Sequence, residues 1–153
     1  MPLRIASTGD TTTCLGQNRD SPPKIDLVAM ENFERLLAIV RRKAVYDRNN
    51  PWYKDPESYL HGLKDEVDEV IEEIPRQRGA YLEDELGDLL WNSLNAVIAL
   101  EKARGITLES VLARACRKFE SRLSGIEAGR SWQEIKEEQK QALAREHAAG
   151  ANR

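Results

Sequence analysis

Two acidic helical segments joined by a short break constrain the fold of this chain more than any other feature. The first reads LKDEVDEVIEEI over residues 63–74, and the second reads YLEDELGDLL over residues 81–90. Pro75 ends the first helix, because its ring disfavours a helical conformation at the residue before it. The break between the segments is short, so the second helix can fold back on the first and bring two acidic faces together.

Four carboxylates lie on those faces. Residues three apart in an α-helix share a side, which places Glu66 with Glu69 and Glu85 with Asp88. Carboxylates that converge repel one another, and their pKa values rise unless a cation neutralises them. A hard divalent cation that prefers oxygen ligands, Mg²⁺ or Mn²⁺, is the natural partner. The sequence therefore predicts a metal site between the two helices.

The apolar residues along the chain recur at spacings of three and four, which is typical of amphipathic helices. Helices are expected at about residues 27–47, from Asp55-Pro56 to 74, at 80–104, after a Thr107 cap, and after a Ser131 capping box. The fourth of these should bury Leu108, Val111, Leu112, Ala115 and Phe119. Short connections favour antiparallel neighbours, so we expect an all-α four-helix bundle with an extra C-terminal helix. The broad apolar face of the third helix suits a bundle centre or an oligomer interface.

The length and composition of the chain favour one soluble domain. The 153 residues carry a formal net charge of −3, too small to indicate nucleic-acid or membrane binding. We expect a disordered arm over residues 1–24, the domain over 25–147 and a ragged end over 148–153. No apolar run is long enough to span a membrane, and the two cysteines, Cys14 and Cys116, suit free thiols in a reducing compartment. The expected location is the cytoplasm.

Other polar and aromatic residues are candidates for substrate contacts. Asn92 and Asn95 share the carboxylate face of the third helix, where they would bind phosphate, sugar or base, or simply pack. Trp52 would stack on a base or plug the core. Basic side chains on the fourth helix, Lys118 and Arg122 among them, would stabilise phosphate charge in a transition state or lie solvated.

The carboxylate pattern resembles a known motif. It reads D-E-x-x-E over residues 65–69, then 15 residues, then E-x-x-D over residues 85–88. This is similar to the E-E-x-x-E and E-x-x-D motifs of the MazG-like nucleotide pyrophosphohydrolases, the all-α NTP pyrophosphatases. The run ELGDLL is similar to that family's core sequence. Further resemblances occur in the family's order over residues 30–140: the helix RLLAIVRRK, the turn Asn50-Pro51-Trp52, Lys118 with Arg122, and Trp132 with Ile135 and Lys136.

The resemblance implies a function and an assembly. Family members hydrolyse nucleoside triphosphates between the α and β phosphates, giving a monophosphate and pyrophosphate, and they form dimers or dimers of dimers. By position, Glu66, Glu69, Glu85 and Asp88 would bind Mg²⁺. Lys118 and Arg122 would contact phosphate oxygens. A homodimer or homotetramer is expected.

Some positions depart from the family pattern. Asp65 stands where the family has a Glu that orients or deprotonates the attacking water, and it is one methylene shorter. The family's Cys-Pro-Trp-Asp turn appears as residues 50–53, NPWY. Two alternatives therefore stay open: a pyrophosphohydrolase of the same fold that acts on dUTP or phosphoribosyl-ATP, and a non-catalytic helical module with a structural cation.

Overall fold

The computed structural model describes residues 26–51 and 55–151. Within these ranges every regular element is a helix, which confirms the expected all-α class. Two 3₁₀ turns, η1 (Asp47–Asn49) and η2 (Ile74–Arg76), follow the first and second helices. The α-helices are α1 (Leu27–Tyr46), α2 (Glu57–Glu73), α3 (Gly79–Arg104), α4 (Leu108–Glu127) and α5 (Trp132–Ala151). The predicted N-terminal arm lies outside the described residues.

Several helix ends follow from local chemistry, as the sequence predicts. Thr107 and Ser110 form a reciprocal capping box at the start of α4. Ser131 and Glu134 do the same at the start of α5, where each side chain bonds the backbone N–H of the other residue. Gly105 ends α3 with a φ of 69°, a left-handed conformation that glycine adopts without steric cost.

Two helix ends differ from the prediction. The α2 helix begins at Glu57, two residues after the predicted cap, although Asp55 still accepts a hydrogen bond from the Ser58 N–H. At the other end of the chain, α5 continues to Ala151, whereas the prediction placed the end of the ordered domain at residue 147. Alanine has the highest helix propensity, and the alanines in this last turn extend the helix.

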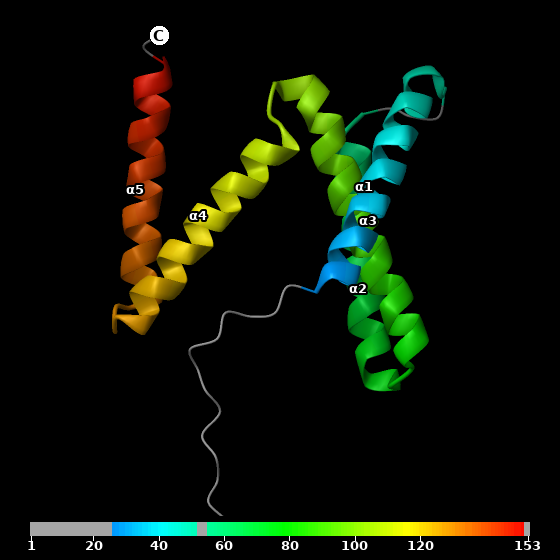
Figure 1. Ribbon diagram of the computed structural model, residues 1–153, viewed down its shortest axis with the longest axis horizontal. Helices are drawn as coiled ribbons and strands as arrows, with labels where there is room; N and C mark the ends of the chain where they lie inside the picture. The colour runs from blue at the N-terminus through cyan, green and yellow to red at the C-terminus, as the bar shows by residue number, and fades with distance from the viewer. Residues whose placement is uncertain (1–25, 52–54, 152–153) are drawn as a thin grey trace, which may run out of the picture.

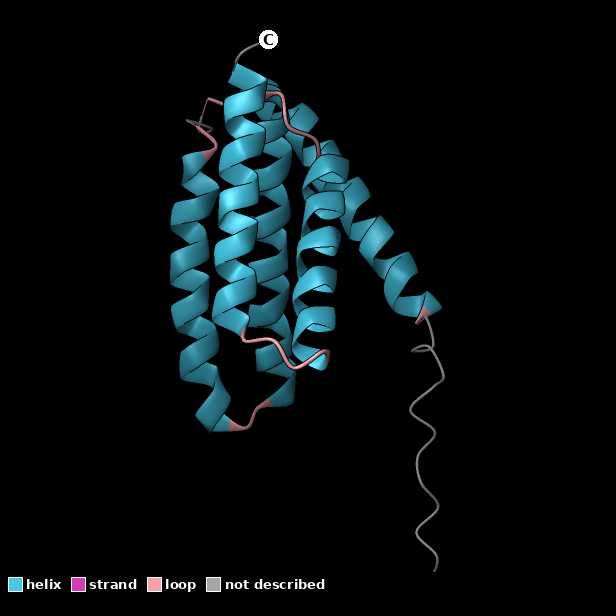
Figure 2. Cartoon of the chain, turned by 90° about the vertical axis from the view of Figure 1, so that its left-hand side faces the viewer, coloured by secondary structure: helices cyan, strands magenta, loops and turns pink. Residues whose placement is uncertain are grey.

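The five helices form two groups. Helices α1, α2 and α3 pack together, and the contact between α2 and α3 is the most extensive in the molecule. Helix α4 then diverges from α3 and pairs with α5 as a hairpin (Figures 1 and 2). The predicted four-helix bundle is therefore not seen in the single chain, because α4 packs mainly on α5.

A small core holds the first group together. Val40 of α1 is completely buried, and Leu94 and Ile98 of α3 lie against it. Leu108, at the start of α4, joins this cluster and anchors the second group to the first. Partly buried side chains surround the core: Phe33, Leu36, Leu37, Ala44, Trp91 and Val97.

The α4–α5 hairpin closes on Ile135, which is almost completely buried. A Cβ atom at Gly125 would collide with the end of the Ile135 side chain, so glycine permits the close approach of the two helices. The predicted inner face of α4 is only partly buried: Leu108 is covered, while Leu112 and Phe119 remain about half exposed, at 45% and 52%. No helix in the described part of the chain is long and apolar enough to cross a membrane.

An ion-pair cluster stabilises the turn between α2 and α3. Glu73, at the end of α2, is buried and receives two hydrogen bonds from Arg78, at 2.8 Å and 2.6 Å. Arg76 adds a contact of 3.3 Å, and the Arg78 guanidinium lies over the Tyr81 ring. Between the two arginines, Gln77 adopts a left-handed conformation with a φ of 55°. The cluster thus determines where α3 begins relative to α2.

We expect Glu73→Gln to lower the melting temperature by about 5 °C at pH 7, because it removes the charge that both arginines bind. Glu72→Gln is the matched control, since Glu72 is exposed and makes one ion pair of 3.4 Å. Hydrogen bonds from Arg78 hold the pKa of Glu73 below its ordinary value of 4.5, so its contribution is present above pH 4.5 and is lost as the pH falls. Thermal melts should therefore converge for wild type and Glu73→Gln at acidic pH. Equal melting temperatures at pH 7 would contradict this role.

Candidate metal centre

The antiparallel packing of α2 on α3 brings three of the predicted metal ligands together. Glu66 of α2 and Glu85 and Asp88 of α3 each offer a carboxylate oxygen, and these oxygens lie within 4.8 Å of one another. All three donors are hard oxygens from two rigid helices, which fits Mg²⁺ or Mn²⁺ and does not suit a soft metal. The arrangement agrees with the site that the helical spacing predicts.

Glu69 completes the predicted set of four. It lies one turn after Glu66, and its carboxylate contributes to the raised pKa of Glu85. The negative charge of Glu69 also raises the pKa of Glu66, as does the negative charge of Asp88. The structure therefore groups three of the four predicted carboxylates, Glu66, Glu85 and Asp88, and Glu69 is not part of that group.

The cluster is electrostatically strained without a cation. Partial burial raises the pKa of Glu66, and the neighbouring charges of Asp88 and Glu69 raise it further. Burial also raises the pKa of Glu85, and the neighbouring Glu69 carboxylate raises it further. One group opposes this trend: Asn92 donates a hydrogen bond of 3.2 Å to Glu66 and favours its ionised form. A bound divalent cation would stabilise all of these carboxylates in the charged state.

The remaining candidates lie in different places. Asp65 is exposed beside the cluster, and its charge contributes to the raised pKa of Glu66. Asn95 is buried one turn beyond Asn92, where it donates a hydrogen bond to the carbonyl of Trp91. The proposed base-stacking residue Trp52 lies outside the described residues.

The structure does not bring Lys118 and Arg122 to the carboxylates of the same chain. Both lie on α4 and line a groove against α5 with a volume of about 660 Å³. Arg122 is buried, donates a hydrogen bond of 2.7 Å to Gln139, and stacks against Phe119 and Trp132. Because α4 diverges from α2 and α3, this groove is separate from the acidic cluster within one chain (Figure 1).

Sequence reasoning missed a second polar cluster, where α1 ends. Asp47 is buried and accepts hydrogen bonds of 2.6 Å from both Lys43 and Tyr59, and one of 3.3 Å from Asn50. Burial raises the pKa of Asp47, but these hydrogen bonds outweigh burial and hold the pKa below 3.8. The spacing of Lys43 and Asp47, four residues apart, was a signal for their pairing. Nothing in the spacing pointed to Tyr59, which comes from α2.

Comparison with known proteins agrees with the geometry. Residues 54–125 match the family model described as the MazG nucleotide pyrophosphohydrolase domain. The matched segment contains α2, α3 and most of α4, and therefore every carboxylate of the cluster. No curated protein and no solved structure shows a significant similarity to the chain.

We expect Mg²⁺ to raise the melting temperature of the wild type by about 3 °C at tenfold excess over its dissociation constant. Glu85→Gln should abolish this rise, and its metal-free form should melt no lower than the wild type, because one repelling charge is gone. Glu83→Gln, an exposed position on the same helix, is the control and should keep the response. Differential scanning fluorimetry with and without EDTA measures both effects. An undiminished rise in Glu85→Gln would place the cation elsewhere.

Proposed function

We propose that this chain, which carries a MazG nucleotide pyrophosphohydrolase domain, is a Mg²⁺-dependent enzyme that hydrolyses nucleoside triphosphates between the α and β phosphates. The observation that carries the proposal is the convergence of Glu66, Glu85 and Asp88, with Glu69 beside them, inside the segment that matches the family. The products are a nucleoside monophosphate and pyrophosphate. The role is the removal of non-standard or excess nucleotides, or control of nucleotide pools, in the cytoplasm.

The proposed chemistry requires a negatively charged site to accept a negatively charged substrate. Glu66, Glu69, Glu85 and Asp88 would hold a Mg²⁺ ion, which would supply charge neutralisation and lower the pKa of a nearby water. The water oxygen forms a bond to phosphorus as the bridging P–O bond breaks, and the bond's electron pair leaves with the pyrophosphate.

The proton of the attacking water needs an acceptor. Asp65 is our candidate, because it is an exposed carboxylate on α2 next to a proposed ligand. As it is not part of the tight cluster, it can move toward a water without disturbing the metal ligands. Asp65→Glu keeps the carboxylate and reaches further, so it is expected to retain turnover. Asp65→Asn removes the carboxylate that accepts the proton and is expected to lose turnover.

We expect Glu69→Gln to lower turnover at least a hundredfold, because it removes a charge on the proposed ion while the side chain keeps its shape. Asp68→Asn, an exposed neighbour on α2, is the control and should retain activity. The assay is Mg²⁺-dependent pyrophosphate release from the common NTPs and dNTPs, with dUTP, ITP and phosphoribosyl-ATP added. Turnover of dUTP or phosphoribosyl-ATP alone would favour the alternative substrates. Absence of turnover, with a Mg²⁺-dependent melting temperature, would favour a structural cation.

The proposed enzyme acts as a homodimer or homotetramer. Two observations support an assembly. Large apolar side chains on α3 and α4 are exposed in the single chain, including Leu86, Leu90, Phe119 and Leu123, and a soluble protein rarely leaves so many uncovered. Among the described residues, no basic side chain forms an ion pair with Glu66, Glu69, Glu85 or Asp88. The α4–α5 groove of another copy offers basic groups for the substrate's phosphates.

The groove has the charge that phosphate recognition needs. Of its lining residues, six are basic and two are acidic: Arg114, Arg117, Lys118, Arg122, Lys136 and Lys140 against Glu137 and Glu146. Among the described residues no carboxylate forms an ion pair with Arg122, although its side chain is buried. A buried guanidinium without a counter-ion favours an anionic ligand. We therefore assign the phosphate contacts to Lys118 and Arg122 of a neighbouring copy.

Mixing inactive chains tests this arrangement. Lys118→Ala and Glu69→Gln should each be nearly inactive alone, but a refolded mixture should recover up to about a quarter of wild-type activity, because some mixed assemblies hold one intact site. Arg145→Ala on α5, outside the groove, is the control and should behave like wild type. Size-exclusion chromatography with light scattering establishes that the mixture assembles. Recovery near zero in assembled mixtures would show that each site uses one chain only.

A further inference from the structure

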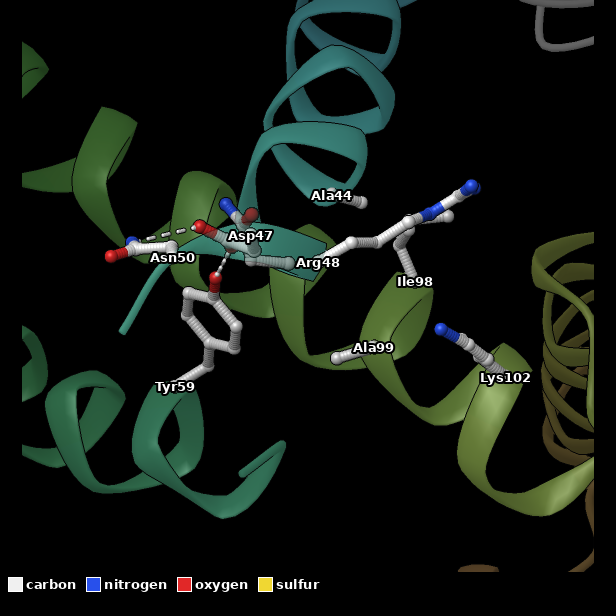
Figure 3. Close-up of a pocket in the computed structure, with 9 residues that line it drawn as sticks. Ala44, Asp47, Arg48, Asn50, Tyr59, Ile98, Ala99 and Lys102 are labelled. Carbon is white, nitrogen blue, oxygen red and sulfur yellow. Dashed lines mark hydrogen bonds between the residues drawn. The ribbon is translucent and has the colours of Figure 1, made fainter. Parts of the chain in front are cut away.

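A pocket lies beside the buried Asp47, at the end of α1. Its volume is about 270 Å³. Figure 3 shows Tyr59 of α2 pointing toward Asp47, while Ile98 and Ala99 of α3 form the opposite wall. Arg48 and Lys102 extend at its rim, and Asn95 also lines it (Figure 3). The walls are thus partly apolar, with a few polar groups between them, as in small-molecule sites.

The pocket and the metal centre lie along the same contact between α2 and α3. On α2, Tyr59 of the pocket precedes Glu66 of the cluster by seven residues, and on α3, Asn95 follows Asp88 by seven. Both intervals are two helical turns, about 10 Å at 1.5 Å per residue. Between them Gly62 lies against the side chain of Asn92, which is bonded to Glu66. The two helices therefore give the same separation between pocket and cluster.

That separation matches the shape of the proposed substrate. Cleavage between the α and β phosphates requires the α phosphate to lie near the carboxylates, and the nucleoside is attached directly to that phosphate. The nucleoside must therefore lie within one nucleotide length of the carboxylates. A volume of about 270 Å³ is below the roughly 300–1,000 Å³ of pockets for drug-sized ligands, so the pocket suits the nucleoside half without its phosphates.

The polar groups inside the pocket suit an uncharged ligand, and the cations Arg48 and Lys102 lie at its rim. The Asp47 carboxylate is already bonded to Lys43, Tyr59 and Asn50, so it does not present an unbalanced charge. Asn95 is 3% exposed and uses one amide N–H for the Trp91 carbonyl, at 2.8 Å. An amide carries a second N–H and a carbonyl oxygen, and this donor and acceptor are what a base or sugar edge requires.

Resting on the function proposed above, the geometry points to the pocket between Tyr59, Asn95 and Ala99 as the nucleoside subsite, with Asn95 as a residue that determines nucleotide preference. The rigid α3 helix then carries the metal ligand Asp88 and the nucleoside contact Asn95 at a set distance. A substrate that fits both is held with its α phosphate at the carboxylates.

Two substitutions and one control test the assignment. Asn95→Ala should lower kcat/KM for the preferred nucleotide about tenfold and reduce its advantage over other bases by the same factor, as expected for one lost hydrogen bond. Ala99→Leu fills the pocket and should raise KM for every nucleotide, while Mn²⁺ affinity measured by electron paramagnetic resonance stays unchanged. Ser93→Ala, exposed on the same helix, should change neither. Circular dichroism melts establish that each variant is folded.

The outcomes separate this inference from the proposed function. If wild type turns over nucleotides but both variants keep its preference and KM, the subsite is elsewhere and the reaction still stands. If wild type turns over none, the proposed reaction fails, and saturation-transfer NMR with nucleoside monophosphates tests the pocket directly. Base-proton signals in wild type that disappear in Ala99→Leu would support the subsite. Equal signals in both, or competition by inorganic phosphate alone, would overturn it.

Discussion

The antiparallel contact between α2 and α3 is the constraint on which the rest of the structure depends. It places carboxylates that repel one another on facing surfaces, so the hairpin must be stabilised by other interactions. The cluster of Glu73, Arg76 and Arg78 does this at the turn, where the buried Glu73 carboxylate accepts short hydrogen bonds from the half-exposed Arg78. The ion pairs at the turn thus offset the repulsion between the carboxylates further along the hairpin. A bound cation can relieve that repulsion.

Charge is distributed unevenly over the molecule, which a net charge of −3 does not reveal. The contact between α2 and α3 is acidic, and the groove between α4 and α5 is basic. The two surfaces lie on different helical groups. Within one chain they therefore do not neutralise each other, and each keeps its charge. In the assembly that we propose, these opposite charges would orient one copy against another.

The local features of the fold were predictable, because they depend on residues close in sequence. Helical spacing predicted that Glu66, Glu69, Glu85 and Asp88 would converge, and the structure groups three of them, without Glu69. The capping residues Thr107 and Ser131 predicted two helix starts. The packing partner of α4 was not predictable, since an apolar stripe shows that a helix buries a face but not against which neighbour. The bonds from Lys43 and Tyr59 to Asp47 were missed for a related reason. They join α1 to α2, and each of the three residues alone resembles ordinary helix surface.

The pattern of helix contacts also has a consequence for how the chain folds. The largest helix contacts join neighbours in sequence, α2 with α3 and α4 with α5, and α1 packs on α3, one helix further along the chain. Chains with such local contacts have a low contact order and fold quickly, because little loop entropy is lost before contacts form. During synthesis, the α1–α3 unit can therefore form before α5 has left the ribosome, and α4 and α5 can pair later without rearranging it.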